Sequence, residues 1–572
     1  MNRPRVAHPE IVTRRVPPRR PAWIERATSA DHKSVAQIYL AAAATFLVLA
    51  VTEFVLMRVQ LLVPDNTMIH PEIFARLLSA SGVTLAVLFA VPLVLGVIGY
   101  IVPLQIGARG VALPRLNLLS VWLYLVGGAA VYLSFLYTPP EAGVVALAPL
   151  SDTVFSPSHG VDAWIVGTSL ATLGFVCFAI NLVTTLRNMR APGLAWRRTP
   201  LFTWAAAVIG YMLLVIGPLM LAALTMLFVD RHSDGIFFAP GEGGAPLLYE
   251  HLSYIYLTGI YLIVLLFAGG VISEILPTFA RKPIYSYRAV AASFVAIGIL
   301  GPLAWIQNMY FAPIPIGFDY MAMVVALALA VPIGTLLVCW VATLGRGSLR
   351  LRAPLLYALA ALSTIVCGLT GELMYSVIPV GWQLGHTTAS QGDTLYVIVG
   401  GTVLGGFAAL HYWLPKMTGR LVGEGVSKIA LVTILFGIHL YVIPMFLAGL
   451  AGQPVDVYKY FSGTDLSTFN LIASIGAFFL AAGILIELGV LARGYAHGLL
   501  SGHDPWEGTT LEWFALSPPP PHNFDAVPDV RSPEPLLDIR EAVRRRTESW
   551  HLPEREEAPA AAPSDGERES VS

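Results

Sequence analysis

The amino-acid sequence predicts an all-α membrane protein that crosses the bilayer twelve times. Of its 572 residues, 56% are hydrophobic and only 12% are charged, the apolar residues gather in long runs, and the basic residues favour alternate loops. Soluble domains carry about a quarter charged residues, so this composition excludes a chain of several soluble domains. The fold class follows from composition, run length and charge bias together.

Each apolar run is long enough for one span, because a membrane helix needs about 20 residues to cross about 30 Å of hydrocarbon. In chain order we expect spans near residues 35–57, 83–105, 117–137, 162–186, 203–228, 252–280, 289–311, 320–344, 354–376, 393–415, 427–451 and 468–494. Loops after the even-numbered spans hold about fifteen Lys and Arg, against about four after the odd-numbered spans. Basic loops stay on the cytoplasmic side, so both termini are expected there.

Composition divides the chain into four segments. Residues 1–27 are rich in Arg and Pro and lack the apolar centre of a secretory signal, which predicts a basic cytoplasmic extension. Residues 28–500 form the membrane domain, residues 501–540 a Pro-rich strap, and residues 541–572 a charged, disordered tail. We expect no soluble catalytic domain.

Net charge and cysteine spacing exclude other classes. The net charge is −1 and no basic patch with interleaved aromatic residues occurs, so nucleic acid is not an expected partner. Cys177, Cys339 and Cys367 stand singly in apolar runs, without the paired spacing of zinc, iron–sulfur or redox sites. They are expected to be core residues.

Several long motifs occur in order along the chain. They include T-S-A-D-H-K-S from Thr28, L-M-R-V-Q-L from Leu56, Y-I-V-P-L-Q-I-G-A from Tyr100, V-I-S-E-I-L-P-T-F from Val271, Y-W-L-P-K-M-T-G from Tyr412, D-P-W-E-G-T-T-L-E-W from Asp504 and S-P-P-P-P-H-N-F from Ser517. Through these motifs residues 28–540 resemble subunit I of the bacterial aa3-type cytochrome c oxidases, in the haem-copper oxidase family. The resemblance implies a twelve-helix subunit I bundle in a bacterial inner (plasma) membrane.

The resemblance also implies a set of histidines. Such an oxidase holds one haem between two axial histidines, a second haem on one histidine and a copper ion on three more, because imidazole suits both metals. In the second span, the family's M-H-G-T-T matches A-S-G-V-T, which places Ser81 at a haem position. In the sixth span, E-H-L-S-Y-I-Y-L-T-G-I-Y-L from Glu250 places Thr258 at a copper position.

The seventh and tenth spans continue the pattern. W-I-Q-N-M-Y replaces the family's W-x-H-H-M-Y, and D-T-L-Y-V replaces H-F-H-Y-V. The former ligand positions are therefore occupied by Ser81, Thr258, Gln307, Asn308, Asp393 and Leu395. The family's proton-transfer, cross-linking and propionate-binding positions also differ; they match Ile260, Leu262, Leu336, Gly110, Val455 and Asp456.

The polar substitutes allow two interpretations. If the fold is kept, Thr258, Gln307, Asn308 and Asp393 converge on one former cofactor pocket, where they could hold water or a hard ion. We favour a mutually hydrogen-bonded polar plug, because buried polar groups need partners. Asp393 alone could bind a metal, but it lies near an expected helix start, where an acid also suits the helix dipole or an N-cap.

The remaining ionisable residues in the spans are expected to be structural. His251, His411 and His439 do not stand at matched ligand positions, and His386 is one place away from a family metal-site pair. Acids in or near the spans could form a proton path, but no regular spacing joins them. These acids are Glu53, Glu274, Glu372 and Glu487.

The sequence thus predicts a subunit I-like protein with no catalytic, cofactor-binding or metal-binding residues and no cofactor. Its expected role is a structural or assembly component of a respiratory complex, beside oxidase subunits II and III or an active subunit I-like protein in the lipid bilayer. One alternative is an active terminal oxidase with displaced ligands, which would need haem and copper. A second is an ion or small-molecule path through the emptied pocket.

Overall fold

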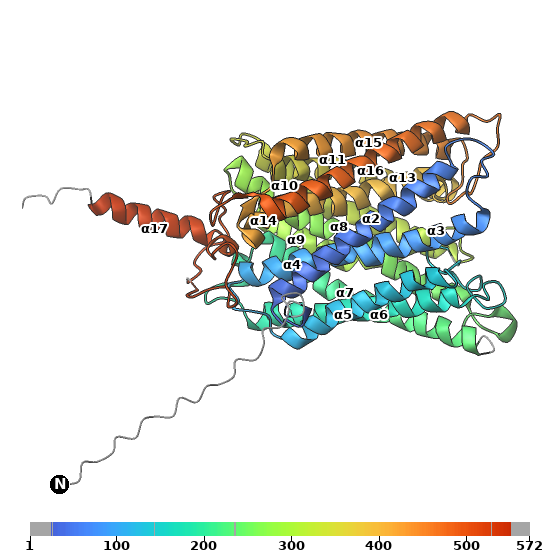
Figure 1. Cartoon of the computed structure of the whole chain (residues 1–572), viewed down its shortest axis with the longest axis horizontal. Coiled ribbons are helices and arrows are strands. Elements are labelled where there is room, and N and C mark those ends of the chain that lie inside the picture. The colour runs from blue at the N-terminus through green and yellow to red at the C-terminus, as the bar shows by residue number, and fades with distance from the viewer. Residues whose placement is uncertain (1–24, 26, 142, 234–235, 528, 551–572) are drawn as a thin grey trace, which may run out of the picture.

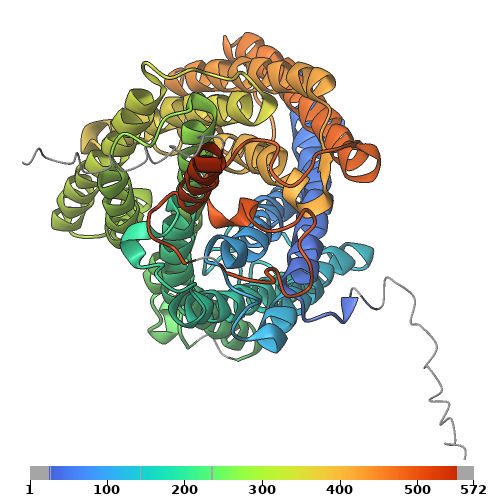
Figure 2. The ribbon, with the colours of Figure 1, turned by 90° about the vertical axis from the view of Figure 1, so that its left-hand side faces the viewer.

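The computed structural model describes residue 25 and residues 27–141, 143–233, 236–527 and 529–550. In this part of the chain, twelve helical segments are long and apolar enough to span a membrane, which confirms the predicted number. They lie along the long axis of a closed, round bundle (Figures 1 and 2). The expected extension, residues 1–27, falls almost entirely outside the described residues, as does the end of the expected tail.

Most spans are single helices. They are α2 (His32–Gln60), α5 (Pro114–Leu133), α6 (His159–Asn188), α7 (Leu201–His232), α8 (Pro246–Ala280), α10 (Ile316–Leu344), α11 (Ala353–Tyr375), α15 (Glu424–Leu450) and α16 (Leu466–His497). Helices adjacent in sequence pack side by side, most extensively α15 with α16 and α5 with α6. A short helix, α12 (Ile378–Leu384), links α11 to the tenth span.

The second, seventh and tenth spans change helix type along their length. The second comprises α3 (Pro71–Val83), the π-helix η1 (Thr84–Ala90) and α4 (Val91–Gln105). The tenth comprises α13 (Thr388–Ile398), the π-helix η6 (Val399–Leu404) and α14 (Gly405–Thr418), while the seventh passes from α9 (Tyr287–Leu300) into the 3₁₀-helix η5 (Gly301–Met309). Such wider or tighter turns are frequent at functional sites.

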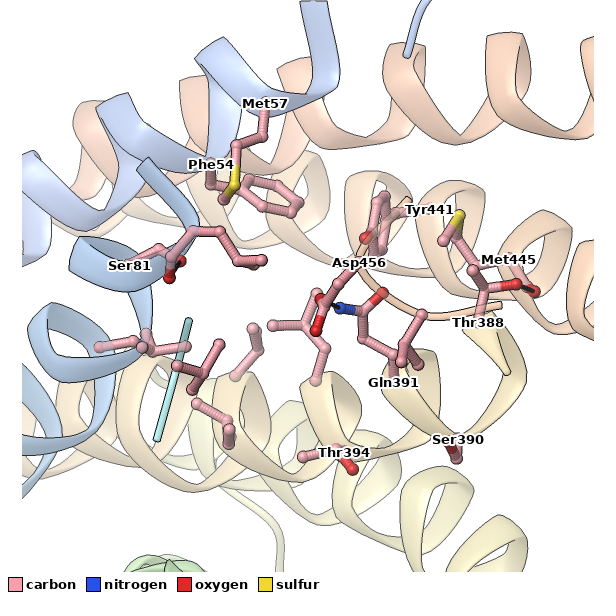
Figure 3. Close-up of a pocket in the computed structure, with 18 of the residues that line it drawn as sticks. Phe54, Met57, Ser81, Thr388, Ser390, Gln391, Thr394, Tyr441, Met445 and Asp456 are labelled. Atoms are coloured by element: carbon pink, nitrogen blue, oxygen red, sulfur yellow. Dashed lines mark hydrogen bonds between the residues drawn. The ribbon is translucent and has the colours of Figure 1, made fainter. Parts of the chain in front are cut away.

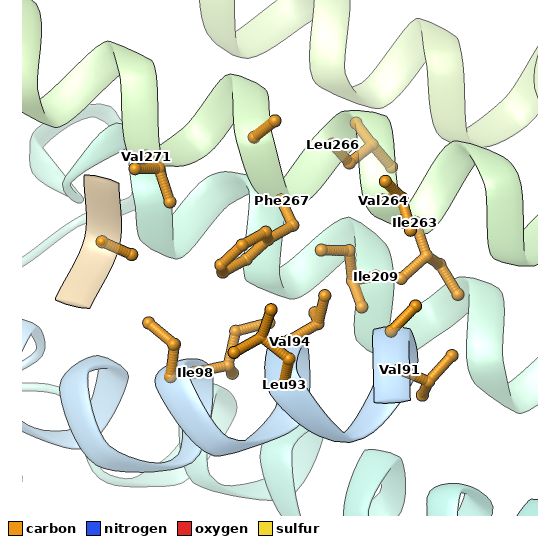
Figure 4. Close-up of a cluster of buried hydrophobic side chains, with 14 of the residues drawn as sticks. Val91, Leu93, Val94, Ile98, Ile209, Ile263, Val264, Leu266, Phe267 and Val271 are labelled. Carbon is orange, nitrogen blue, oxygen red and sulfur yellow. The ribbon is translucent and has the colours of Figure 1, made fainter. Parts of the chain in front are cut away.

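The core lies around α4, in which every residue is buried. Val91, Val94 and Ile98 of α4 face Ile209 of α7 and Phe267 of α8 (Figure 4). A helix that is apolar on all sides belongs inside a bundle. The spans that carry Ser81 and Thr258 are therefore held against each other by this core.

Glycines allow close contact between neighbouring helices. A Cβ atom added to Gly127 of α5 would lie 2.4 Å from the carbonyl oxygen of Gly167 in α6, and one added to Gly437 of α15 would lie 2.3 Å from the backbone nitrogen of Leu480 in α16. Because lipid is as apolar as the side chains, helix association in membranes depends on such close packing.

The C-terminal segment docks across the end of the bundle where α2 begins. Asn523 contacts His32 Nε2, accepts a hydrogen bond from Lys33 Nζ at 2.9 Å and donates one to the Ala108 carbonyl at 2.8 Å. Two motifs far apart in sequence, D-H-K and P-H-N-F, thus form one buried contact. Nearby lie the antiparallel strands β1 (Arg420–Leu421) and β2 (Leu499–Leu500) and the 3₁₀-helix η7 (Leu511–Trp513).

The expected Pro-rich strap runs into a helix, α17 (Pro535–Trp550), that projects from the bundle (Figure 1). No proline follows Pro535 within this stretch, and Pro is well suited to the first turn of a helix. An ion pair between Arg545 and Glu541, four residues apart, also favours helix formation.

Candidate functional site

Two cavities lie inside the bundle. Cavity A has a volume of about 470 Å³ and is lined mainly by α2, α3, α13 and α15 (Figure 3). Cavity B has a volume of about 600 Å³ and is lined mainly by η1, α6, α8, α10 and α11. Gln307, Asn308, Glu372 and Thr394 line both cavities, so they form a shared wall.

Five of the six predicted ligand positions line these cavities. Ser81 and Leu395 line cavity A, Thr258 lines cavity B, and Gln307 and Asn308 lie in the shared wall. The π-helices help to place them, because residues of η1 line both cavities and residues of η6 line cavity A. Asp393 is the sixth position and does not line either cavity.

The predicted polar plug forms only in part. Asn308 Nδ2 donates a hydrogen bond to Thr258 Oγ1 at 3.1 Å. Gln307 instead donates to the backbone carbonyl of Glu372 at 3.3 Å, and Ser81 donates to the carbonyl of Leu78 at 2.9 Å. The substitutes are thus satisfied mostly by their own surroundings and only once by one another.

Asp393 does not cap its helix, so the expectation of an N-cap or first-turn role is wrong. The helix begins earlier, at Thr388, and Thr387 is its N-cap, with a side chain that accepts from the Ala389 amide. Asp393 lies in the second turn, buried, and accepts a hydrogen bond from the Tyr375 hydroxyl at 2.7 Å.

The sequence did not single out Glu372 as a cavity residue. This acid interrupts the apolar end of α11, and its Oε1 atom accepts a hydrogen bond from Thr394 at 3.1 Å in the shared wall. The sequence feature that could have marked Glu372 as a cavity residue is its position as a single acid in an apolar run. The four span acids form no hydrogen bond to one another within the described chain, and each has separate partners.

Arg58 is a second cavity residue that sequence reasoning missed. It is buried beside cavity A, donates to the Asn470 carbonyl and to Ser474, both at 3.0 Å, and lies over the Tyr441 ring. Its Nε atom has no hydrogen-bond partner, and no described carboxylate forms an ion pair with it. Burying a charge without an opposite charge nearby costs free energy, so Arg58 destabilises this part of the cavity wall.

Asp456 and His386 bring a carboxyl and an imidazole to the same cavity. Asp456 accepts a hydrogen bond from Gln391 at 3.1 Å (Figure 3). Burial raises the pKa of Asp456, opposed by the Gln391 hydrogen bond and by His386. Burial likewise lowers the pKa of His386, opposed by Asp456. Both effects favour the neutral forms of the two groups.

The other histidines in the spans have structural partners, as the sequence predicts. His251 Nδ1 accepts a hydrogen bond from Trp305 at 3.0 Å, and His439 Nδ1 lies 2.6 Å from the Tyr396 hydroxyl. His411 contacts Glu487 at 2.7 Å in a buried cluster.

The fold and the cavities define a polytopic helical membrane protein with two internal cavities between its spans. The chain belongs to the cytochrome c and quinol oxidase polypeptide I family, whose model matches residues 34–479. Cytochrome c oxidase subunit 1 of Bacillus subtilis is 36% identical over 518 residues, covering 90% of this chain and 83% of that protein. Quinol oxidase subunit 1 of the same organism is 31% identical over 523 residues, covering 91% and 81%.

A solved structure supports the fold. A heme-copper terminal oxidase dimer contains a chain that superposes with a TM-score of 0.69 at 15% identity, covering 89% of each chain. The predicted twelve-helix haem-copper oxidase subunit I bundle is thereby confirmed, and the chain is a multi-pass membrane protein.

Family membership overturns the expectation of no cofactor. Haem and copper are the groups that a haem-copper oxidase family implies, so the expectation of none is wrong for a member of it. That expectation came from matching six positions one at a time. Such a comparison says nothing about the space that the fold retains between the spans, and cavities of about 470 and 600 Å³ remain there.

The side chains around the cavities do not fit the family's histidine set. Two haems and a copper ion need imidazoles from several spans. Of the residues lining cavity B none is a histidine, and His386 is the one histidine lining cavity A. Within the described ranges, no group of three or more His, Cys, Asp and Glu could hold a metal ion.

Proposed function

We propose that this chain is a subunit I homologue that acts as a structural or assembly component of a respiratory-chain complex. In this proposal the oxygen-reducing centre belongs to another subunit. The proposal takes the family's six histidine positions to be those that the motifs match to Ser81, Thr258, Gln307, Asn308, Asp393 and Leu395.

The observation that carries the proposal is the chemistry of the cavity walls. Thr258 and Asn308 hydrogen bond to each other, and a hydroxyl paired with an amide is a poor substitute for imidazole as a ligand of haem iron or copper. Ser81 is likewise engaged with the backbone of its own helix. Thr258, Asn308 and Ser81, at three of the predicted ligand positions, therefore already have hydrogen-bond partners within the protein.

The rest of the scaffold supports a folded and assembled protein. The all-buried α4, the close contacts of α5 with α6 and the docked C-terminal segment are well packed. Val324, Val331 and Val338 of α10 are exposed on the outside of the bundle, where lipid or another membrane subunit would cover them. Oxidase subunits II and III, or an active subunit I-like protein, are the proposed partners.

The loop charges support a multi-pass protein of the bacterial plasma membrane with both termini in the cytoplasm. The segment boundaries at residues 27, 500 and 540 are part of the same proposal. The C-terminal strap would then lie on the cytoplasmic face, over the start of α2.

Oxygen consumption by the purified chain, together with the subunits that co-purify with it, tests the proposal. We expect no uptake above buffer with reduced cytochrome c once the chain has been separated from its partners, and stoichiometric co-purification of another oxidase subunit before that separation. An active oxidase prepared in the same way is the control. Sustained, cyanide-sensitive uptake by the separated chain would contradict the proposal and favour an active oxidase with displaced ligands.

A further inference from the structure

A third cavity, cavity C, lies apart from the two inner cavities, at the end of the bundle covered by the C-terminal segment. Its volume is about 1040 Å³. Its walls come from the end of α8, the starts of α11 and α15, the last turns of α16 and the loop around Trp506. Cavity C shares no lining residue with cavity A or cavity B.

The charges that line cavity C are almost all positive. Arg350, Arg352 and Arg493 line it, and Glu424 is its one acidic lining residue. Glu424 is already shared, since Arg352 contacts its Oε1 atom at 3.4 Å and Lys428 contacts its Oε2 atom at 3.3 Å. The side chains of Arg350 and Arg493 form no ion pair or hydrogen bond with the described part of the chain. Arg350 interacts with a carboxylate only at longer range, with Glu507. An anion entering the cavity would therefore meet two arginines whose side chains are not held in a described ion pair.

A buried histidine at the wall of the cavity adds a directed polar group. His411 is 3% exposed, and its Nε2 atom bonds both Glu487, at 2.7 Å, and Ser427, at 2.8 Å. The Nδ1 atom makes no hydrogen bond to a described residue, and His411 is one of the residues that line the cavity. The Glu487 carboxylate accepts further hydrogen bonds from Tyr357 and Ser427, which fix the ring in place.

Two helix starts also open into cavity C. The N-cap positions of α11 and α15 are Arg352, whose side chain does not cap the helix, and Gly423, which has no side chain. The first backbone N–H groups of a helix attract anions through their own hydrogen-bonding capacity and through the helix dipole. These backbone amides would attract an anion into cavity C, as the arginines would.

The rest of the wall is apolar and lies at the ends of the membrane spans. Leu421, Val422, Val490 and Leu499 line it, and Leu499 is 79% exposed. A free inorganic anion would make no use of this surface, whereas an acyl chain would. Basic pockets between the ends of membrane helices are suited to the head groups of acidic lipids.

We propose that cavity C binds one anionic phospholipid, with the phosphate among its three arginines and the acyl chains along its apolar wall. The lipid would join α11, α15 and α16 at one end of the bundle. This role does not depend on whether the chain reduces oxygen.

Native mass spectrometry of the delipidated full chain tests the proposal by titration with phosphatidylglycerol or phosphatidylcholine. We expect one site that prefers phosphatidylglycerol by roughly tenfold or more, as expected for several arginines near one phosphate. The double variant Arg350→Gln, Arg493→Gln should lose that preference and leave phosphatidylcholine binding unchanged. Both arginines are exposed, so folding is expected to be retained; gel filtration checks this.

The matched control is the double variant Arg115→Gln, Arg197→Gln, which removes two exposed arginines from the same end of the bundle. It should bind phosphatidylglycerol like the unaltered chain. An equal loss in both double variants would overturn the proposal, since net charge alone would then explain binding. Equal binding of the two lipids would overturn it as well, and so would inorganic phosphate binding without phosphatidylglycerol binding.

Discussion

Polar side chains have different kinds of hydrogen-bond partner at the end of the bundle beneath the C-terminal segment and at the inner cavities. At the bundle end, buried polar groups from distant motifs contact each other directly, as Asn523 does with His32 and Lys33. At cavities A and B, polar side chains at the predicted ligand positions donate mainly to backbone carbonyls, Ser81 to its own helix and Gln307 to α11. The difference indicates that the contacts that assemble this scaffold are separable from the residues that face its cavities.

The largest expected effect comes from the bundle end. Replacing Asn523 with Gly removes the partner of three polar groups, of His32, Lys33 and the Ala108 carbonyl, while Gly tolerates the positive φ of 61° at this position. We expect the free energy of unfolding to fall by about 2–4 kcal/mol, because each buried group left without a hydrogen bond costs about 1–3 kcal/mol. Thermal unfolding in detergent measures this.

Arg346→Gly is the control for that substitution. Arg346 also has a positive φ, of 60°, but is exposed, so the change should shift the free energy of unfolding by no more than about 0.5 kcal/mol. Equal destabilisation by the two variants would show that the extra conformational freedom Gly gives the unfolded chain, and not the loss of the buried contact, explains the effect at residue 523.

A smaller effect is expected at the shared wall of the inner cavities. Thr258→Val should cost about 1 kcal/mol, because it removes the acceptor of the Asn308 side chain. The double variant Thr258→Val, Asn308→Leu should return to within about 0.5 kcal/mol of the unaltered chain, since no polar group is then left unpaired. A double-mutant cycle of unfolding free energies measures the coupling. Additive losses would instead mean that each residue has another essential partner.

The smallest effect is a pH dependence with opposite signs at two carboxyls outside the spans. Burial raises the pKa of Asp456 above 3.8, so the folded protein holds this proton longer than the unfolded chain. Stability should therefore fall as the pH rises from 3.8 through the raised value, and Asp456→Asn should remove that fall.

Glu507 is the matched control for the pH experiment. Its hydrogen bond to Arg281 lowers its pKa, so its contribution is present above the ordinary value of 4.5 and is lost as the pH falls through the lowered value. The effect should stay below about 1 kcal/mol, since this pair is largely exposed. Unfolding midpoints between pH 3 and pH 7 for the unaltered chain, Asp456→Asn and Glu507→Gln measure the two slopes, and slopes of the same sign would contradict the assignment.

Hydropathy was sufficient to predict the twelve spans, because lipid imposes length and composition on each one. It placed the starts of the second and tenth spans too late. Arg76, Ser79 and Ser81 lower the hydropathy of α3, and α13 begins at Thr388, before its apolar run. Asp393 was wrongly expected at the start of its helix because the tenth span was predicted to begin there.

The cavity walls could be predicted only where a family motif marked them. The resemblance led to five residues that do line the cavities. It did not lead to Glu372 or to cavity C, because no pattern in the sequence joins the segments that meet there. Arg350, His411, Val422 and Arg493 lie on four separate stretches of chain and come together only in the folded bundle.

In two of the spans, the π-helices η1 and η6 allow the helical segments on either side to be rotated relative to each other about the helix axis. Each residue turns an α-helix by about 100°, so a turn that holds one additional residue lets the segments on either side keep different orientations. In the second span, α4 can stay locked in the core while α3 turns Ser81 toward cavity A. A one-residue insertion or deletion within η1 would therefore rotate α3 and change which of its side chains face cavity A. The packing of α4 in the core would be retained.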